Sequence, residues 1–276
     1  MIGRYTVTLD NKSLEAQYTY TVGKNTIRPI VILDVNYSGA QFQTKNHTTA
    51  NQHGYEVSDF YCNKRTVSVT FQIREYDIAK RNSALTKVIN WARLGGKLRT
   101  NDKTGMYLDV RCEHLPVIES VRNWLDTLKI VFSSVGVPFW QNEALSSLAL
   151  TAGKSGKGTL KTTGNLTPEC GGSPVAVTIT AKANVTSIQL AVKSLTGTTK
   201  LILSGFKLTE GKVMTISYKN DRYLSIKVGS VAHMEYLQPS SSDMLLASCG
   251  TSVGNEASFS ADGKIAVTFE TRGLWL

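Results

Sequence analysis

Alternation of apolar and polar residues at every second position constrains the fold more than any other feature of this chain. It is clearest in residues 65–75, where the apolar positions are Val67, Val69, Phe71 and Ile73. A period of two puts one side of the backbone against a core, so this segment is predicted to be a half-buried β-strand. Long Ala, Glu, Leu and Lys tracts are missing, and Thr, Ser, Val and Gly are abundant, which favours strands and turns. The expected fold class is mainly β.

A single segment carries helical spacing. Asp77 offers a carboxylate to cap the first backbone N–H groups of a helix, and Gly95-Gly96 supplies a residue that tolerates the left-handed conformation after its end. The apolar positions between them fall on one helical stripe: Ile78, Leu85, Val88, Ile89 and Ala92. One amphipathic helix packed on a sheet is therefore expected.

Further strands are expected before and after this helix. The N-terminal ones are residues 3–9, 27–35, 97–100, 106–112, 117–122 and 124–133. Residues 38–63 are polar, rich in Asn, Gln, Thr and Gly, and lack periodicity, which predicts a long loop or an arm. A surface excursion and an interlocking arm of an assembly both remain open for this segment.

Short strands with turns between them continue to the C-terminus, without a second helix pattern. They are residues 175–181, 187–192, 200–204, 213–218, 225–228, 257–260 and 264–269. Asn220-Asp221 and Ala261-Asp262-Gly263 lie where hairpin turns are needed. Regular strand spacing over such a length predicts a β-sandwich. The expected domains are residues 1–143 and 144–276.

The positive charge is spread over the whole chain. The formal net charge is +10; residues 1–143 carry 18 Lys and Arg against 13 Asp and Glu, and residues 144–276 carry 13 against 8. A nucleic-acid footprint is usually a concentrated basic stripe, whereas these cations alternate with apolar residues, as in Lys200-Leu201. Specific nucleic-acid binding is therefore not expected.

No recognisable catalytic or ligand motif is present. Residues 153–159, with the sequence GKSGKGT, only superficially resemble a phosphate-binding loop, because Lys157 is followed by Gly158 and no helix pattern follows. The histidines show no metal-binding spacing: His47, His53, His114 and His233. The cysteines are far apart and are expected to be buried apolar residues rather than ligands: Cys62, Cys112, Cys170 and Cys249. No catalytic, cofactor-binding or metal-binding residue is predicted, no cofactor is expected, and the chain is not expected to be an enzyme.

The order of the elements resembles that of phage distal tail proteins. The resemblance begins with the strand Arg65–Phe71, continues through the helix and residues 97–99 to the strand Leu128–Phe132, and includes Pro138-Phe139-Trp140. It implies an N-terminal belt domain followed by a galectin-like or carbohydrate-module-like β-sandwich. The closing segments, from Gly254-Asn255 through residues 264–269 to Arg272-Gly273-Leu274-Trp275, resemble the end of the family's second domain.

The resemblance implies a structural virion protein at the tip of a long non-contractile tail. Belt domains of six copies would form a ring around the tail channel, with the tail tube protein, the tail-tip or tail-fibre hub protein and receptor-binding proteins as partners. The excess Lys and Arg are then expected away from the channel or in salt bridges. The N-terminus lacks a signal-peptide pattern and no apolar stretch has membrane-span length, so assembly in the host bacterial cytoplasm and no membrane partner are expected.

Two other functions remain open. One is the equivalent hub of a phage-tail-like bacteriocin, which belongs to the same class. The other is a carbohydrate-binding β-sandwich module, which would need an exposed aromatic platform. The candidate platform residues are Tyr218, Tyr223 and Tyr236.

Overall fold

The computed structural model describes residues 5–39, 42–47, 56–116, 127–166, 171–219, 223–250 and 253–276. The chain forms two compact units. Unit 1 comprises Met1–Gln41 and Cys62–Trp140, and unit 2 comprises Phe42–Tyr61 and Gln141–Leu276. Within the described residues, no helix has the length and apolarity needed to cross a membrane.

Unit 1 is built on an antiparallel sheet whose central strand is β8, Thr66–Ile73. Its side chains alternate between buried and half-buried, as the period-two pattern predicts. Strand β8 pairs with β5 (Ile30–Tyr37) on one side and β11 (Thr127–Ser134) on the other. The sheet continues from β11 through β10 (Met106–His114), β9 (Gly96–Thr100) and β1 (Val7–Leu9) to β2 (Lys12–Ser13).

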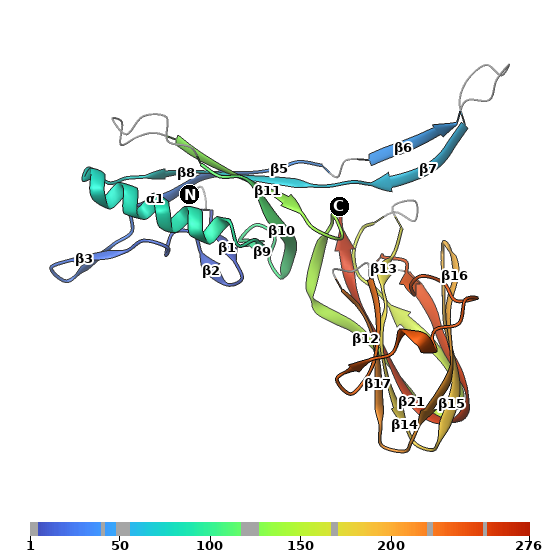
Figure 1. Ribbon diagram of the computed structural model, residues 1–276. Helices are drawn as coiled ribbons and strands as arrows, with labels where there is room; N and C mark the ends of the chain where they lie inside the picture. Colours follow the sequence, from blue (N-terminus) through green and yellow to red (C-terminus); the bar gives the residue numbers. More distant parts are fainter. Residues whose placement is uncertain are drawn as a thin grey trace. The chain divides into compact units, whose positions relative to one another are not determined.

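The one α-helix among the described residues, α1 (Ile78–Ala92), lies against one face of this sheet (Figure 1). Asp77 caps its start, because its side chain accepts hydrogen bonds from the N–H groups of Ala79 and Lys80. After its end, Gly95 adopts a φ of +65° and donates its N–H to the carbonyl of Ala92. Both predicted ends of the helix are therefore confirmed.

The buried face of α1 is displaced from the predicted stripe. It consists of Arg81, Ala84, Val88, Trp91 and Ala92, and the Trp91 ring meets Phe132 of β11 edge to face at 6.0 Å. Ile78 is 56% exposed, and Leu85 and Ile89 are only partly buried. The prediction was wrong for Ile78, while Val88 and Ala92 are buried as predicted and Leu85 and Ile89 lie at the edge of the buried face.

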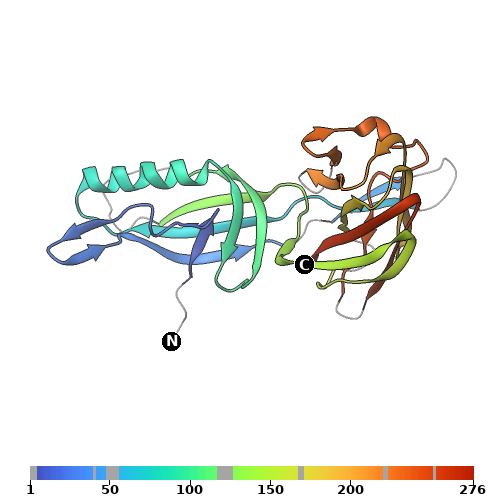
Figure 2. The same ribbon diagram turned by 90° about the horizontal axis from the view of Figure 1, so that it is seen from below.

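A short hairpin of β3 (Tyr20–Val22) and β4 (Asn25–Ile27) runs beside α1 (Figure 2). The Lys80 ammonium lies 4.6 Å from the centre of the Tyr20 ring, and the Lys87 ammonium lies 5.2 Å from that of Tyr18. These cation–π contacts hold the hairpin against the polar flank of the helix.

The polar segment predicted to be a long loop or an arm, residues 38–63, contains two strands. They are β6 (Phe42–His47) and β7 (Glu56–Cys62), which pair with each other in a separate two-stranded sheet. The expectation that the segment lacks regular structure was therefore wrong for these residues, whereas the alternative of an arm stays open. The predicted strand at residues 117–122 lies outside the described residues, as does the turn Asn220-Asp221.

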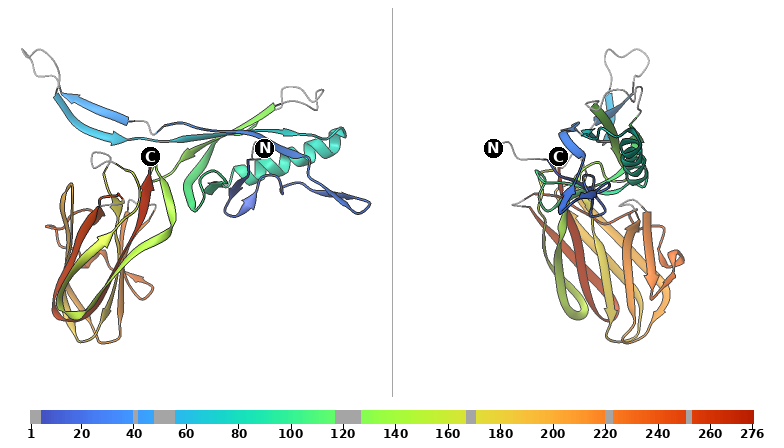
Figure 3. Two further views of the ribbon diagram at one scale, coloured as in Figure 1. Left: turned by 180° about the vertical axis from the view of Figure 1, so that it is seen from behind. Right: turned by 90° about the vertical axis from the view of Figure 1, so that its left-hand side faces the viewer.

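Unit 2 is a β-sandwich, with strands arranged in two layers (Figure 3). One layer contains β14, β17, β18 and β19, and the other contains β15 and β16. The bounds are β14 Ala176–Ala181, β15 Val185–Ser194, β16 Gly197–Leu208, β17 Val213–Lys219, β18 Tyr223–Val228 and β19 Val231–Ala232. A separate pair, β13 (Ser173–Pro174) and β20 (Leu246–Ala247), and the short 3₁₀ turn η2 (Met234–Tyr236) complete the unit. The predicted sandwich is confirmed.

One strand joins the two layers. In β21 (Gly254–Trp275), residues 256–261 pair with β15 and residues 265–270 pair with β14. The change of partner occurs at Asp262-Gly263, where the sequence predicts a turn. There the Asp262 carboxylate accepts hydrogen bonds from the hydroxyl and N–H of Thr186 and from the N–H of Ser187, which fixes the crossing point.

The long strand β12, Trp140–Lys161, was not predicted. Gly158 lies against the side chains of Leu148 and Leu150, so the second half of β12 folds back beside the first. The segment that superficially resembles a phosphate-binding loop, residues 153–159, lies inside this strand. No helix N-terminus is therefore available there to hold a phosphate.

A buried polar network closes one end of the sandwich. Asn255 is fully buried; its Oδ1 accepts from the N–H of Ser248 (2.8 Å). Its Nδ2 donates to the carbonyls of Leu160 (3.3 Å) and Ser248 (3.1 Å). The Thr162 hydroxyl also donates to the Ser248 carbonyl. One side chain thus links segments that are far apart in the sequence.

Candidate interaction surfaces

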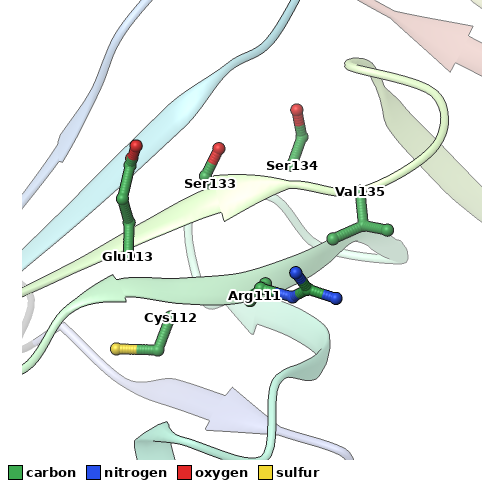
Figure 4. A pocket seen from close by; sticks show the side chains of 6 residues that line it. All are labelled: Arg111, Cys112, Glu113, Ser133, Ser134 and Val135. Carbon is green, nitrogen blue, oxygen red and sulfur yellow. The ribbon is translucent and has the colours of Figure 1, made fainter.

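A charged hollow of about 310 Å³ opens at the ends of β10 and β11 in unit 1 (Figure 4). Its walls are Arg111, Cys112, Glu113, Ser133, Ser134 and Val135. A β-bulge between Cys112 and His114 interrupts the regular pairing of β10 with β11, and bulges often change the direction of side chains at a functional surface. The hollow therefore combines charged, hydroxyl and apolar groups in a small space.

The electrostatics of this hollow are set by cations. The Lys64 ammonium donates to Glu113 Oε1 at 2.8 Å, and this hydrogen bond lowers the pKa of Glu113. Arg111 is exposed on the same wall. Burial raises the pKa of the Cys112 thiol, so this cysteine is not an activated nucleophile.

The backbone of Arg65, directly before β8, is hydrogen-bonded to Ser134, which lines the hollow. Its N–H donates to Ser134 Oγ at 2.9 Å, and its carbonyl accepts from the N–H of Ser134 at 2.8 Å. The residue is only 5% exposed, and burial lowers the pKa of its guanidinium. A buried arginine next to a surface hollow is a feature that the sequence analysis did not identify.

A second polar cluster surrounds Tyr37 at the end of β5. Its hydroxyl donates to Asp102 Oδ1 at 2.7 Å and lies 2.9 Å from Thr100 Oγ1. Burial and the hydrogen bond to Asp102 raise the pKa of Tyr37, so its hydroxyl stays protonated. The ring also meets Trp140 edge to face at 5.7 Å. These contacts fix the end of β5, and this cluster is structural.

Large apolar side chains are exposed near the start of α1. Tyr76 is 74% exposed, Ile78 is 56% exposed, and Val22 at the end of β3 is 59% exposed. Exposed apolar groups that gather in one region often mark a contact with another protein. We call Tyr76 and Ile78, which are two residues apart in the sequence, the helix-start patch.

The sandwich offers little aromatic surface to a sugar ring. Tyr218 is largely buried and its hydroxyl accepts from the N–H of Leu245; burial raises its pKa to about 12. The Tyr236 ring stacks on His233 at 4.6 Å and packs against Phe206. It is therefore already in contact with two other rings of the same unit. Tyr223 is 67% exposed. Of the three candidate platform residues, only Tyr223 is strongly exposed.

The histidines and cysteines do not form a metal site in the described part of the chain. No group of three or more His, Cys, Asp and Glu side chains that could hold a metal occurs in the described part of the chain. Cys249 is buried, as expected, whereas Cys62 and Cys112 are only partly buried, so the prediction was wrong for these two. Cys170 and His53 lie outside the described residues.

The fold has known counterparts among solved structures, although no protein-family model and no curated protein matches the sequence. The Dit protein of phage SPP1, described as a paradigm of the hub adsorption apparatus in phages infecting Gram-positive bacteria, aligns with a TM-score of 0.66 and 11% identity. The alignment covers 98% of this chain and 99% of that one. The chain has the fold of a phage distal tail protein. Two structures of the phage P2 baseplate in its activated conformation, with Ca and with Sr, align at 10% identity with TM-scores of 0.47 and 0.44; the alignments cover 99% and 98% of this chain and 98% and 97% of the phage chains.

The Dit fold confirms the resemblance drawn from the order of the elements. The match extends over both units, including β12 and the β6–β7 pair, which the sequence analysis did not predict. Phe139 and Trp140 of the proline-aromatic segment are 3% and 1% exposed. These aromatic residues therefore belong to the core and are not an interaction surface.

Proposed function

We propose that this chain is a structural hub protein of a phage tail, forming a hexameric ring at the distal end of a long non-contractile tail. The observation that supports this most strongly is the alignment with SPP1 Dit over almost the full length of both chains. A likeness covering both units is much harder to obtain by chance than one sandwich matching another. The proposed role is structural and not catalytic.

In a ring of identical subunits, each subunit contacts the next head to tail. Each subunit therefore needs two different faces that fit each other. Unit 1 carries the helix-start patch, which we propose as part of one such face. The polar strands β6 and β7 form a two-stranded ribbon, which supports the arm reading of residues 38–63. An arm of this kind would reach a neighbouring subunit by strand pairing or surface contact.

The proposed partners are the tail tube protein, the tail-tip or tail-fibre hub protein and receptor-binding proteins. Residues 1–143 would form the ring-forming belt, and residues 144–276 the galectin-like sandwich. The proposed location is the tail tip of the virion, after assembly in the host bacterial cytoplasm. The equivalent hub of a phage-tail-like bacteriocin would use the same ring.

The test is light-scattering mass measurement after size exclusion at several concentrations, with negative-stain images of the main peak. We expect a mass six times that of the monomer and closed rings with a central hole. The variant Ile78→Glu places a charge in the helix-start patch and is expected to shift the mass towards the monomer, whereas Lys182→Glu on the exposed surface of unit 2 is the control. A wild-type monomer at every concentration, without rings, would contradict the proposal.

A further inference from the structure

The charged hollow and the helix-start patch lie at opposite ends of strand β8. Ser133, which lines the hollow, pairs with Thr66, the first residue of β8. Tyr76 of the patch comes after Ile73, the last residue of β8. The 8 residues of the strand span about 23 Å, at a rise of about 3.3 Å per residue. The Tyr76 side chain of a subunit therefore cannot reach the hollow of the same subunit.

One wall of the hollow faces away from the helix. Arg111 and Ser133 are directly paired, so their side chains emerge on the same face of the sheet. The residue before Ser133, Phe132, points to the opposite face, where its ring contacts Trp91 of α1. Unit 1 thus presents two different surfaces, one at the start of α1 and one on the uncovered face at the other end of β8. A head-to-tail contact between subunits requires two such surfaces.

The hollow has the size and the chemistry to take one aromatic side chain. Its volume is about 310 Å³, and its walls combine the apolar Val135 with the exposed Arg111 and with Ser133 and Ser134. A guanidinium attracts the face of an aromatic ring, and a serine hydroxyl can exchange a hydrogen bond with a phenol. Tyrosine has an apolar ring and a polar tip, so it would use both kinds of wall.

Tyr76 offers such a side chain at the other end of the unit. It is 74% exposed, the highest exposed fraction among the large apolar and aromatic side chains of the described residues. The adjacent Asp77 is exposed and negatively charged, whereas Arg111 at the hollow is exposed and positively charged. Complementary charges favour the approach of these two surfaces. Tyrosine and arginine are also enriched among the residues that contribute most to protein–protein binding.

We propose that Tyr76 of one subunit inserts into the hollow of a second copy of this chain, against Arg111 and Ser133 of that copy. The occupant is a second copy because the same chain carries both the exposed ring and the hollow, too far apart to meet within one subunit. Repeated from subunit to subunit, this contact uses one Tyr76 and one hollow of every copy. Closure into a six-membered ring rests on the proposed function; the contact itself needs only two copies.

The strength of the contact is measured by mass photometry of the full chain over a dilution series. We expect Tyr76→Ala and Arg111→Ala each to raise the concentration of half-assembly at least about tenfold. Tyr223→Ala removes an exposed tyrosine of unit 2 and is the matched control, with little change expected. The double variant of Tyr76 and Arg111 should assemble about as well as either single variant, because both changes remove the same contact. Unchanged assembly of Tyr76→Ala, or losses that multiply in the double variant, would overturn the proposal.

Photo-crosslinking locates the contact without removing it. The photoreactive residue p-benzoylphenylalanine takes the place of Tyr76, or of Tyr223 in the control, and light and heavy isotope-labelled chains are mixed before illumination. From position 76 we expect crosslinks between copies to the peptides that carry residues 111–113 or 133–135, and from position 223 we expect none to these peptides. Crosslinks from position 76 to other peptides alone would overturn the proposal.

The mass of the wild type separates this contact from the proposed ring. A closed ring that Tyr76→Ala leaves intact would contradict the contact and leave the ring standing. Dimers or open chains of subunits that crosslink from position 76 to the hollow would do the reverse. A wild-type monomer at every concentration, without crosslinks between copies, would refute both.

Discussion

Replacing Asn255 by alanine is the most informative change to the sandwich, because this one side chain makes three buried hydrogen bonds. In Asn255→Ala the Ser248 N–H loses its acceptor and the Leu160 carbonyl loses the donor from β21. The Ser248 carbonyl keeps the Thr162 hydroxyl as a donor. Two newly unpaired buried groups at about 1–2 kcal/mol each give an expected loss of about 3 kcal/mol in the free energy of unfolding.

The assay is urea unfolding followed by circular dichroism, with hydrogen exchange to assign the loss to peptides of unit 2. Asn184→Ala is the control, because Asn184 is exposed on the same unit, and it is expected to change stability by less than about 0.5 kcal/mol. A loss below about 1 kcal/mol for Asn255→Ala would refute the reasoning. It would mean that water or local rearrangement satisfies Ser248 and Leu160 without the amide.

Three further changes test other parts of the fold. Asp77→Ala removes the cap of α1 and is expected to cost about 1 kcal/mol in urea unfolding; no change would contradict the capping role. Asp262 has a lowered pKa, chiefly through its hydrogen bond from the Thr186 side chain, so its contribution to stability is complete above its unfolded pKa and is lost as pH falls through the lower folded value. Asp262→Asn should therefore flatten the acid side of the stability–pH curve, and an unchanged curve would contradict this. In Gly164→Ala the new Cβ would lie 2.1 Å from the Leu274 carbonyl oxygen, at a φ of +122°; a lower Tm is expected, and a Tm equal to that of the wild type would contradict this close approach.

The sequence pattern predicted those elements in which buried and exposed side chains alternate regularly along the chain. Strand β8 and most strands of the sandwich have one face against a core, so their apolar residues recur at every second position. Strands β6 and β7 lie in a polar segment, and hydrophobic periodicity carries no signal for such a ribbon. Strand β12 was missed because most of its side chains are exposed or half-buried. Its residues Gly153 and Lys154 are of types that are common in loops.

The candidate site could be predicted only in part. Arg65 carries one local clue, since a basic residue stands where the alternation of β8 requires a buried side chain. Its backbone hydrogen bonds with Ser134 depend on the pairing of β8 with β11, which come from distant parts of the sequence. The same holds for Asn255, whose partners Leu160 and Ser248 become neighbours only in the folded sandwich. Sequence spacing cannot supply such contacts.

The sharing of β21 between the two layers has a kinetic consequence. Strand β14 is translated well before the residues of β21 that pair with it, as in the pair Val177 and Phe269. Until β21 arrives, β14 and β15 each expose an unpaired edge in an incomplete sandwich. Contacts between residues so distant in sequence form slowly, because a large loop must close first. Unit 2 is therefore expected to finish folding in one late step, with its vulnerability to aggregation confined to the interval before that step.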